Sequence, residues 1–137
     1  MVVVDTNVLY SGLRSQFGAS YVLLDALSDG RVEFAVSAAL VFEYEDVLKR
    51  QKSNLVYDEY EIDEILDSLI GLGHRCSPHF LWRPFLKDAK DDMVLELAVV
   101  SGADQIITYN LKDFTGISEF GIKAIRPFEY LKKEKLI

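Results

Sequence analysis

The chain opens with a short apolar run that ends on a carboxylate. Val2, Val3 and Val4 are β-branched, and Asp5 follows them directly. A run of this kind is typical of a central strand that is covered on both faces. Asp5 would then lie where the strand ends, and in an open parallel α/β sheet ligands bind at the carboxyl ends of the strands. Because an unpartnered buried charge is costly, we expect Asp5 to meet a metal ion, a basic residue or backbone N–H groups.

The length and composition favour one domain. The 137 residues are enough to bury a core without disulfides, and no linker-like stretch divides them, so we expect a single domain over residues 1–137. Cys76 is the only cysteine, which excludes an intrachain disulfide and fits a reducing compartment. With no signal peptide and no apolar segment long enough for a bilayer, the sequence predicts a cytoplasmic protein without a membrane partner.

The net charge of −7 bears on the class of partner. It argues against a protein that holds nucleic acid on a broad basic surface. It leaves a nuclease open, because the carboxylates of a metal site add to the acidic count and bound divalent ions reverse the local charge. Solubility alone would explain the same balance.

Strand-like and helix-like segments alternate from end to end of the chain. The spacing of apolar, capping and terminating residues predicts helices from about Val22 to Gly30, from Ser37 to about Lys52, from the capping pair Asp58 and Glu61 to Gly71–Gly73, from Asp88 to Ser101, and from Pro127 onward. Strands are expected at residues 2–4, 32–36, 105–108 and 122–125, with a short one and then a loop within 74–87. This alternation predicts an α/β fold, a three-layer α/β/α sandwich with a central parallel sheet.

Acidic or amide side chains recur at four places along one edge of this expected sheet. Asp5 ends the first strand. Glu43 borders the buried stripe of its helix on one side and Glu45 borders it on the other, so periodicity alone does not choose between them. The remaining groups are Asp88, Asp91 and Asp92 at a helix start, and Asn110 and Asp113 after the strand that ends at Thr108.

Each group also has a local explanation, because helix starts favour acids and turns favour Asn and Asp. Their common edge is what favours a metal site. Converging carboxylates repel one another, and a divalent cation removes that cost. Mg²⁺ and Mn²⁺ prefer such oxygen ligands, whereas the lack of a Cys/His cluster argues against zinc. We interpret His74 and His79 as structural.

Four segments carry these groups in an order and spacing that resemble one known family. They are Val3-Val4-Asp5-Thr6-Asn7-Val8-Leu9, the stretch from Val36-Ser37 through Glu43-Tyr44 to Val47-Leu48, Asp88-Ala89-Lys90-Asp91-Asp92 through Leu95 and Ala98, and Ile106-Ile107-Thr108-Tyr109-Asn110-Leu111-Lys112-Asp113-Phe114. Together they resemble the PIN domain, and more narrowly its VapC-like branch of toxin ribonucleases from toxin–antitoxin pairs. The resemblance implies a PIN-like fold and a metal-dependent ribonuclease.

The resemblance also implies roles for individual residues. Asp5, Glu43 and Asp91 would hold Mg²⁺ or Mn²⁺, as one or two ions, and Asp91 is preferred over Asp92 because it keeps the family's spacing to Leu95 and Ala98. The commonest form of the family has Asp where Asn110 stands, so Asp113 is expected to supply the fourth carboxylate, with the amide oxygen of Asn110 as the alternative ligand. Supporting roles would fall to Thr6, Asn7, Asp88, Asp92 and Thr108, and contacts to RNA phosphates to Arg14, Lys90 and Lys112.

The implied activity is hydrolysis of RNA by metal-activated water, and the implied partners are a second copy of the chain in a homodimer and a small antitoxin that masks the site. Two other α/β classes fit less well. A receiver domain needs a Lys at the end of its last strand, and a dehalogenase-like phosphatase needs an acid where Asn7 stands. A binding or scaffolding module with a weakened metal site remains the alternative, because Asn110 is uncharged.

Overall fold

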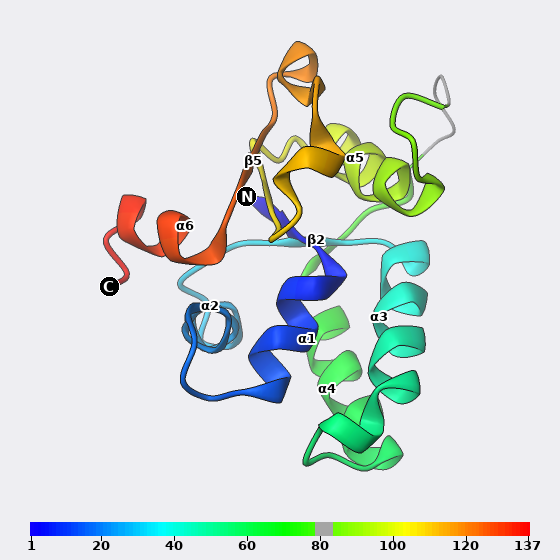
Figure 1. Ribbon diagram of the computed structural model, residues 1–137, viewed down its shortest axis with the longest axis vertical. Coiled ribbons are helices and arrows are strands. Elements are labelled where there is room, and N and C mark those ends of the chain that lie inside the picture. The colour runs from blue at the N-terminus through cyan, green and yellow to red at the C-terminus, as the bar shows by residue number, and fades with distance from the viewer. Residues whose placement is uncertain (79–83) are drawn as a thin grey trace.

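A computed structural model describes residues 1–78 and 84–137, which form a parallel sheet with helices packed around it (Figure 1). The helices are α1 (Thr6–Arg14), α2 (Ala19–Ser28), α3 (Ala38–Arg50), α4 (Glu59–Leu72), α5 (Ala89–Ser101) and α6 (Pro127–Lys133), with short 3-10 turns η1 (Lys52–Asn54), η2 (Leu111–Phe114) and η3 (Ile117–Phe120). The strands are β1 (Val2–Val4), β2 (Ala35–Val36), β3 (His74–Arg75), β4 (Gln105–Ile107) and β5 (Lys123–Ile125). No helix within these residues is long and apolar enough to cross a membrane.

The strands pair in parallel, as the sequence predicts. β4 lies between β1 and β5, with Val3 opposite Ile106, and β2 pairs with β3. A bridge between Val2 and Phe34 joins the two groups of strands. The order across the sheet is therefore β3-β2-β1-β4-β5, which places β1 and the residue that follows it at the centre.

Successive residues of β1 pack into two different buried clusters. Val3 packs with residues of α3, α4 and α5, whereas Val2 and Val4 pack with residues of α2 and α6. In Figure 1, α3 and α6 lie on opposite sides of the strands. None of the three valines is more than 2% exposed, and burying such a side chain contributes about 1.5–3 kcal/mol. Both clusters therefore fix the position of β1, and with it that of Asp5.

Local capping chemistry sets the helix ends close to where the sequence predicts them. The Ser37 hydroxyl accepts the Leu40 N–H at the start of α3, and Asp58 and Glu61 form the expected capping box of α4. Gly102 ends α5 in the left-handed conformation, with φ 74°, which glycine adopts without strain. The strand expected over 32–36 is shorter than predicted, since only Ala35–Val36 joins the ladder beyond the Phe34 bridge.

Helix α1 is the element that sequence analysis did not identify. It begins directly after β1, with Asp5 as its N-cap. Its sequence, TNVLYSGLR, is rich in residues of modest helix propensity, so its stability comes from burial of Val8 and Leu9 rather than from propensity.

Gly12 lets α1 and α2 approach closely. A Cβ at this position would lie 2.9 Å from the carbonyl oxygen of Ser20, a backbone atom that cannot turn aside. At Gly71, inside α4, no described residue comes within 4 Å of the corresponding position. The two glycines form a matched pair that separates helix propensity from crowding.

We predict that Gly12→Ala destabilises the fold by about 1–3 kcal/mol through overpacking, less a gain of about 1 kcal/mol in helix propensity. Gly71→Ala should stabilise it by about 0.5–1 kcal/mol, because only the propensity gain remains. Urea unfolding of both variants measures the difference. Equal effects of the two substitutions would contradict the close α1–α2 contact.

Candidate active site

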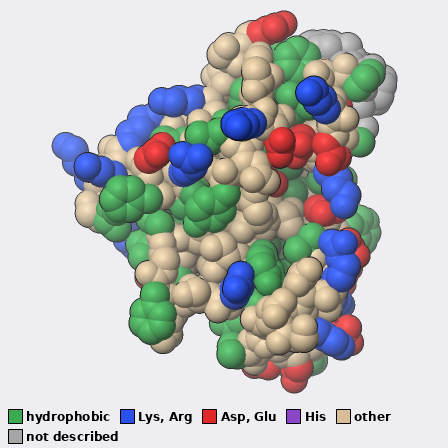
Figure 2. Space-filling view, in the orientation of Figure 1, with side chains coloured by type: hydrophobic (Ala, Val, Ile, Leu, Met, Phe, Trp, Pro, Cys, Tyr) green, Lys and Arg blue, Asp and Glu red, His purple; other side chains and the backbone are tan. Residues whose placement is uncertain are grey.

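A pocket of about 400 Å³ lies at the carboxyl ends of β1 and β4. It is bounded by α3, the start of α5 and the segment after β4. Acidic and amide side chains from all four segments line it: Asp5, Glu43, Asp88, Asp91, Asn110 and Asp113. Figure 2 shows carboxylates gathered on this face near α5, with Lys and Arg side chains around them. The structure thus brings together the four groups that the sequence placed at one edge of the sheet.

Asp5 is the most buried carboxylate of the pocket, at 9% exposed. Its Oδ1 accepts the backbone N–H of Thr6 at 2.8 Å, and its Oδ2 accepts the hydroxyl of Thr108 at 2.7 Å. Burial raises the pKa of Asp5, and these two hydrogen bonds work against the rise because they favour the charged form. Both oxygens are oriented by donors from different elements, so the carboxylate is fixed in place.

The segment after β4 is tied to the same point. The hydroxyl of Thr108, which is fully buried, also accepts the backbone N–H of Asn110 at 3.0 Å. The side-chain oxygen of Asn7 accepts the backbone N–H of Tyr109 at 3.4 Å. Thr108 and Asn7 therefore hold the chain that carries Asn110 and Asp113 against Asp5.

The structure chooses between the two glutamates on α3. Glu43 lines the pocket, whereas Glu45 lies 2.9 Å from the ammonium of Lys49, which also pairs with Asp63. The buried Tyr44 hydroxyl donates to the carbonyl of Val4 and so fastens α3 to the end of β1. This bond sets the rotation of the helix, and the rotation turns Glu43 inward.

Val47 and Gln51 also line the pocket, and sequence analysis did not identify them as site residues. They follow Glu43 at steps of four, the spacing of side chains on one helix face. The sequence contains this four-residue spacing. It points to Val47 and Gln51 only after Glu43, and not Glu45, has been chosen as the glutamate that faces the pocket.

The start of α5 divides its three acids between different tasks. Asp88 caps the helix, accepting the backbone N–H of Lys90 at 2.9 Å, and still lines the pocket. Asp92 is 2% exposed and accepts the backbone N–H of Leu86 at 2.8 Å, so its carboxylate supports the preceding loop instead. Asp91 lines the pocket, in agreement with the preference for Asp91 over Asp92.

Asp91 is the acid whose pKa departs most clearly upward, to about 6. Burial is the main cause, followed by repulsion from Asp5 and Asp113 and then from Asp88 and Asp92. Negative charges therefore crowd this position, which is the electrostatic condition that favours a bound cation.

Of the basic residues expected to contact substrate, Lys90 lines the pocket, whereas Arg14, in the last turn of α1, and Lys112, in η2, are not among the lining residues. His74 lies in β3, with Nε2 4.0 Å from a carboxylate oxygen of Glu33. His79 lies outside the described residues. Thr6, Asn7 and Thr108 contact the site as described above.

The donor set fits a hard divalent cation in its chemistry, because the groups that converge are carboxylate and amide oxygens. Within residues 1–78 and 84–137, no three or more His, Cys, Asp or Glu side chains are drawn together tightly enough to form a closed metal-binding group. The pocket therefore supplies ligands of the right chemistry, although the described residues do not form such a group in this structure.

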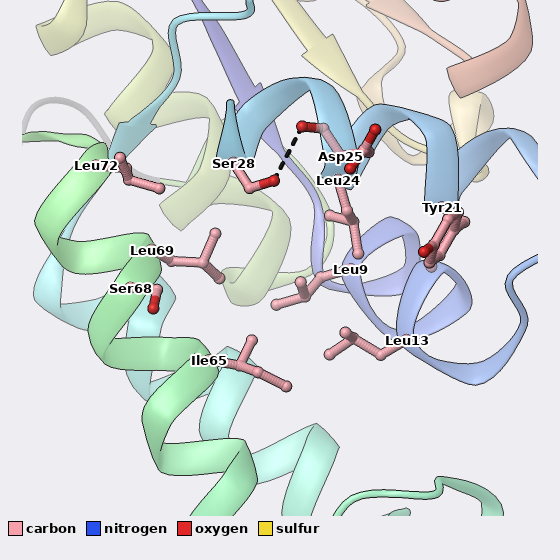
Figure 3. A pocket seen from close by; sticks show the side chains of 11 residues that line it. Leu9, Leu13, Tyr21, Leu24, Asp25, Ser28, Ile65, Ser68, Leu69 and Leu72 are labelled. Carbon is pink, nitrogen blue, oxygen red and sulfur yellow. Dashed lines mark hydrogen bonds between the residues drawn. The ribbon is translucent and has the colours of Figure 1, made fainter. Parts of the chain in front are cut away.

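A second hollow, of about 280 Å³, lies between α1, α2 and α4 (Figure 3). Leucine side chains such as Leu9, Leu24 and Leu69 point into it, with Ile65 from α4. Of the residues lining it within the described part of the chain, Asp25 is the only carboxylate. This hollow is apolar and lacks the donor set of the first pocket, so the chemistry of the protein is assigned to the acidic pocket.

A parallel α/β fold with acids gathered at the carboxyl ends of its strands is an arrangement that several classes of protein share, so the family has to come from comparison with known proteins. The chain belongs to the PIN domain family, whose profile, described as PIN domain, matches residues 1–112. PIN domains are generally nucleases and usually use divalent metal ions. No curated protein matches the chain.

We predict that the metal-free protein loses stability as the pH rises from about 4 to about 7, in part through Asp91. Since the pKa of Asp91 is raised from 3.8 to about 6 by folding, the folded state binds more protons in this range, and the free energy of unfolding falls as they are released. In Asp91→Asn the fall should be smaller, and at pH 7 the variant should melt on the order of 3 °C higher. Calorimetry in EDTA measures both. A wild-type protein and variant with the same pH dependence would show that Asp91 is not crowded by negative charge.

Proposed function

We propose that this protein is an endoribonuclease that hydrolyses phosphodiester bonds of RNA with Mg²⁺ or Mn²⁺. The observation that carries the proposal is the presence in one pocket of carboxylates from four separate segments: Asp5, Glu43, Asp91 and Asp113. Structural needs do not explain the group: burial raises the pKa values of Asp5 and Asp91, and repulsion from neighbouring acids, Asp113 among them, adds to both shifts. Nucleases of the PIN family usually meet such a need with a divalent ion.

In this proposal, Asp5, Glu43, Asp91 and Asp113 hold one or two ions, and the amide oxygen of Asn110 is a further neutral ligand. When bound, the metal lowers the pKa of a water molecule and stabilises charge on the phosphate that is attacked. The protein contributes orientation. Thr6 and Thr108 hold both oxygens of Asp5 before any ion arrives, so little conformational freedom is lost on binding.

The finer assignments belong to the same proposal and rest on the resemblance of the four motifs. They are a toxin role in a toxin–antitoxin pair, a small antitoxin that covers the site, and a homodimer. A place in the cytoplasm is part of the same proposal, and it is supported by the single Cys76, which fits a reducing compartment. The three-layer α/β/α arrangement also belongs here, and the division of β1 between two buried clusters supports it.

We predict that Glu43→Gln lowers metal-dependent cleavage of a structured RNA by about a hundredfold or more, as Asp5→Asn also should, because each removes a charged ligand. Glu45→Gln is the matched control on the same helix. It removes one carboxylate that faces Lys49 instead of the pocket, and cleavage should stay near the wild-type rate. Labelled RNA incubated with Mn²⁺, Mg²⁺ or EDTA and resolved on a denaturing gel measures all of these rates.

Two results would count against the proposal. Cleavage by Asp5→Asn or Glu43→Gln at the wild-type rate would remove these residues from the site. Absence of cleavage by folded wild-type protein in either metal, together with absence of metal binding in a titration, would favour the alternative of a binding or scaffolding module.

A further inference from the structure

Lys90 is the one cationic side chain among the described residues that line the acidic pocket. Its ammonium lies 3.5 Å from Oε1 of Glu43. The side chain of Glu43 is 17% exposed and that of Lys90 is 60% exposed. An exposed cation at the surface therefore contacts a carboxylate that is largely enclosed.

The position of Lys90 in its helix is unfavourable for a cation. It is the second residue of α5, and the N-terminus of a helix carries partial positive charge, which favours acids and disfavours lysine. The helix therefore gives no reason for a lysine here. The acidic pocket does, because Glu43 supplies the opposite charge.

We propose that Lys90 is a displaceable internal counter-ion: it pairs with Glu43 in the metal-free protein and gives up that carboxylate to the divalent ion. The inference rests on the proposed function, since it concerns the same site. In the metal-free protein Glu43 has Lys90 as its counter-charge, and the divalent ion takes that place when it binds.

Displacement is physically easy. An ion pair with one largely exposed partner is weak, because water and salt screen it. A divalent ion at Glu43 would repel the ammonium and bring twice its charge to the same carboxylate. The long and exposed side chain of Lys90 can then turn toward the pocket mouth, where a phosphate of the incoming RNA would take the place of Glu43 as its partner.

The experiment is a calorimetric titration of Mn²⁺ into metal-free protein. Lys90→Gln removes the competing cation, so it should bind Mn²⁺ about two- to fivefold more tightly than wild type, the factor expected for loss of a weak ion pair. Lys90→Arg keeps a cation and should bind as wild type does. Lys112→Gln removes a charge beside Asp113 from a side chain outside the pocket lining, and controls for the general loss of positive charge.

Thermal unfolding tests the same exchange of partners at Glu43 and needs no measurement of nuclease activity. In EDTA, Lys90→Gln loses the ion pair with Glu43 but also removes an unfavourable cation from the helix N-terminus, so the rise in melting temperature that Mn²⁺ causes, and not the value in EDTA alone, reports the ion pair. Saturating Mn²⁺ should raise the melting temperature of Lys90→Gln by about 1–3 °C more than that of wild type, because wild type gives up the Lys90–Glu43 contact when it binds the ion and the variant has no such contact to give up. With RNA as substrate, Lys90→Gln should raise KM more than it lowers kcat.

Each outcome decides the matter. Equal Mn²⁺ affinities of wild type and Lys90→Gln, weaker binding by the variant, or equal tightening by Lys90→Gln and Lys112→Gln would overturn the counter-ion. No Mn²⁺ binding by either protein would overturn it together with the metal dependence of the proposed function. Tighter Mn²⁺ binding by Lys90→Gln alone would uphold it even if no RNA were cleaved, and only the nuclease would then fail.

Discussion

Asp5 is a charged group held in the interior, and the arrangement of the site depends on how its charge is satisfied. Its two oxygens take one donor from the turn into α1 and one from Thr108 at the end of β4. Those two bonds join neighbouring strands at their carboxyl ends, where side-chain ligands are brought together in parallel sheets. The same carboxylate is thus the cap of α1, the link between β1 and β4, and the deepest oxygen donor of the pocket. Removing it would alter all three.

The other acids surround Asp5 at a cost in stability. Burial, and then repulsion from the neighbouring acids, raises the pKa of Asp91 to about 6, which means that folding brings this charge into less favourable surroundings than water. A fold selected for stability alone would place a neutral residue there. The protein keeps the charge, and Lys90 offsets part of the excess from the surface side. Without a cation, the carboxylates of the acidic pocket repel one another. A bound divalent ion relieves this repulsion, which water does not, and the relief favours binding of the ion.

Much of this could be read from the sequence, and the failures have physical causes. The position of Asp5 at the end of a strand could be predicted because the β-branched run before it marks the strand. The capping box at Asp58 could be predicted because it forms between residues that are close in sequence. The choice of Glu43 over Glu45 was not, because a helix has two borders between core and solvent, and the distant bond from Tyr44 to Val4 decides which one faces the sheet. Helix α1 was missed because packing stabilises it where propensity is modest. The ion pair between Lys90 and Glu43 joins α5 to α3. A contact between segments so far apart in the sequence produces no pattern of residue spacing from which it could be predicted.

The fourth carboxylate shows how a site can keep its charge while its sequence pattern changes. Asn110 occupies the position where the commonest form of the family has an acid, and its backbone is held by Thr108. Asp113 follows within the 3-10 turn η2, just beyond the residues matched by the family profile, and lines the same pocket. Its charge raises the pKa values of both Asp5 and Asp91, an effect that a neutral amide cannot produce. Because the turn is anchored at Thr108, a carboxylate three residues later still enters the pocket, and the electrostatic demand for a cation is preserved.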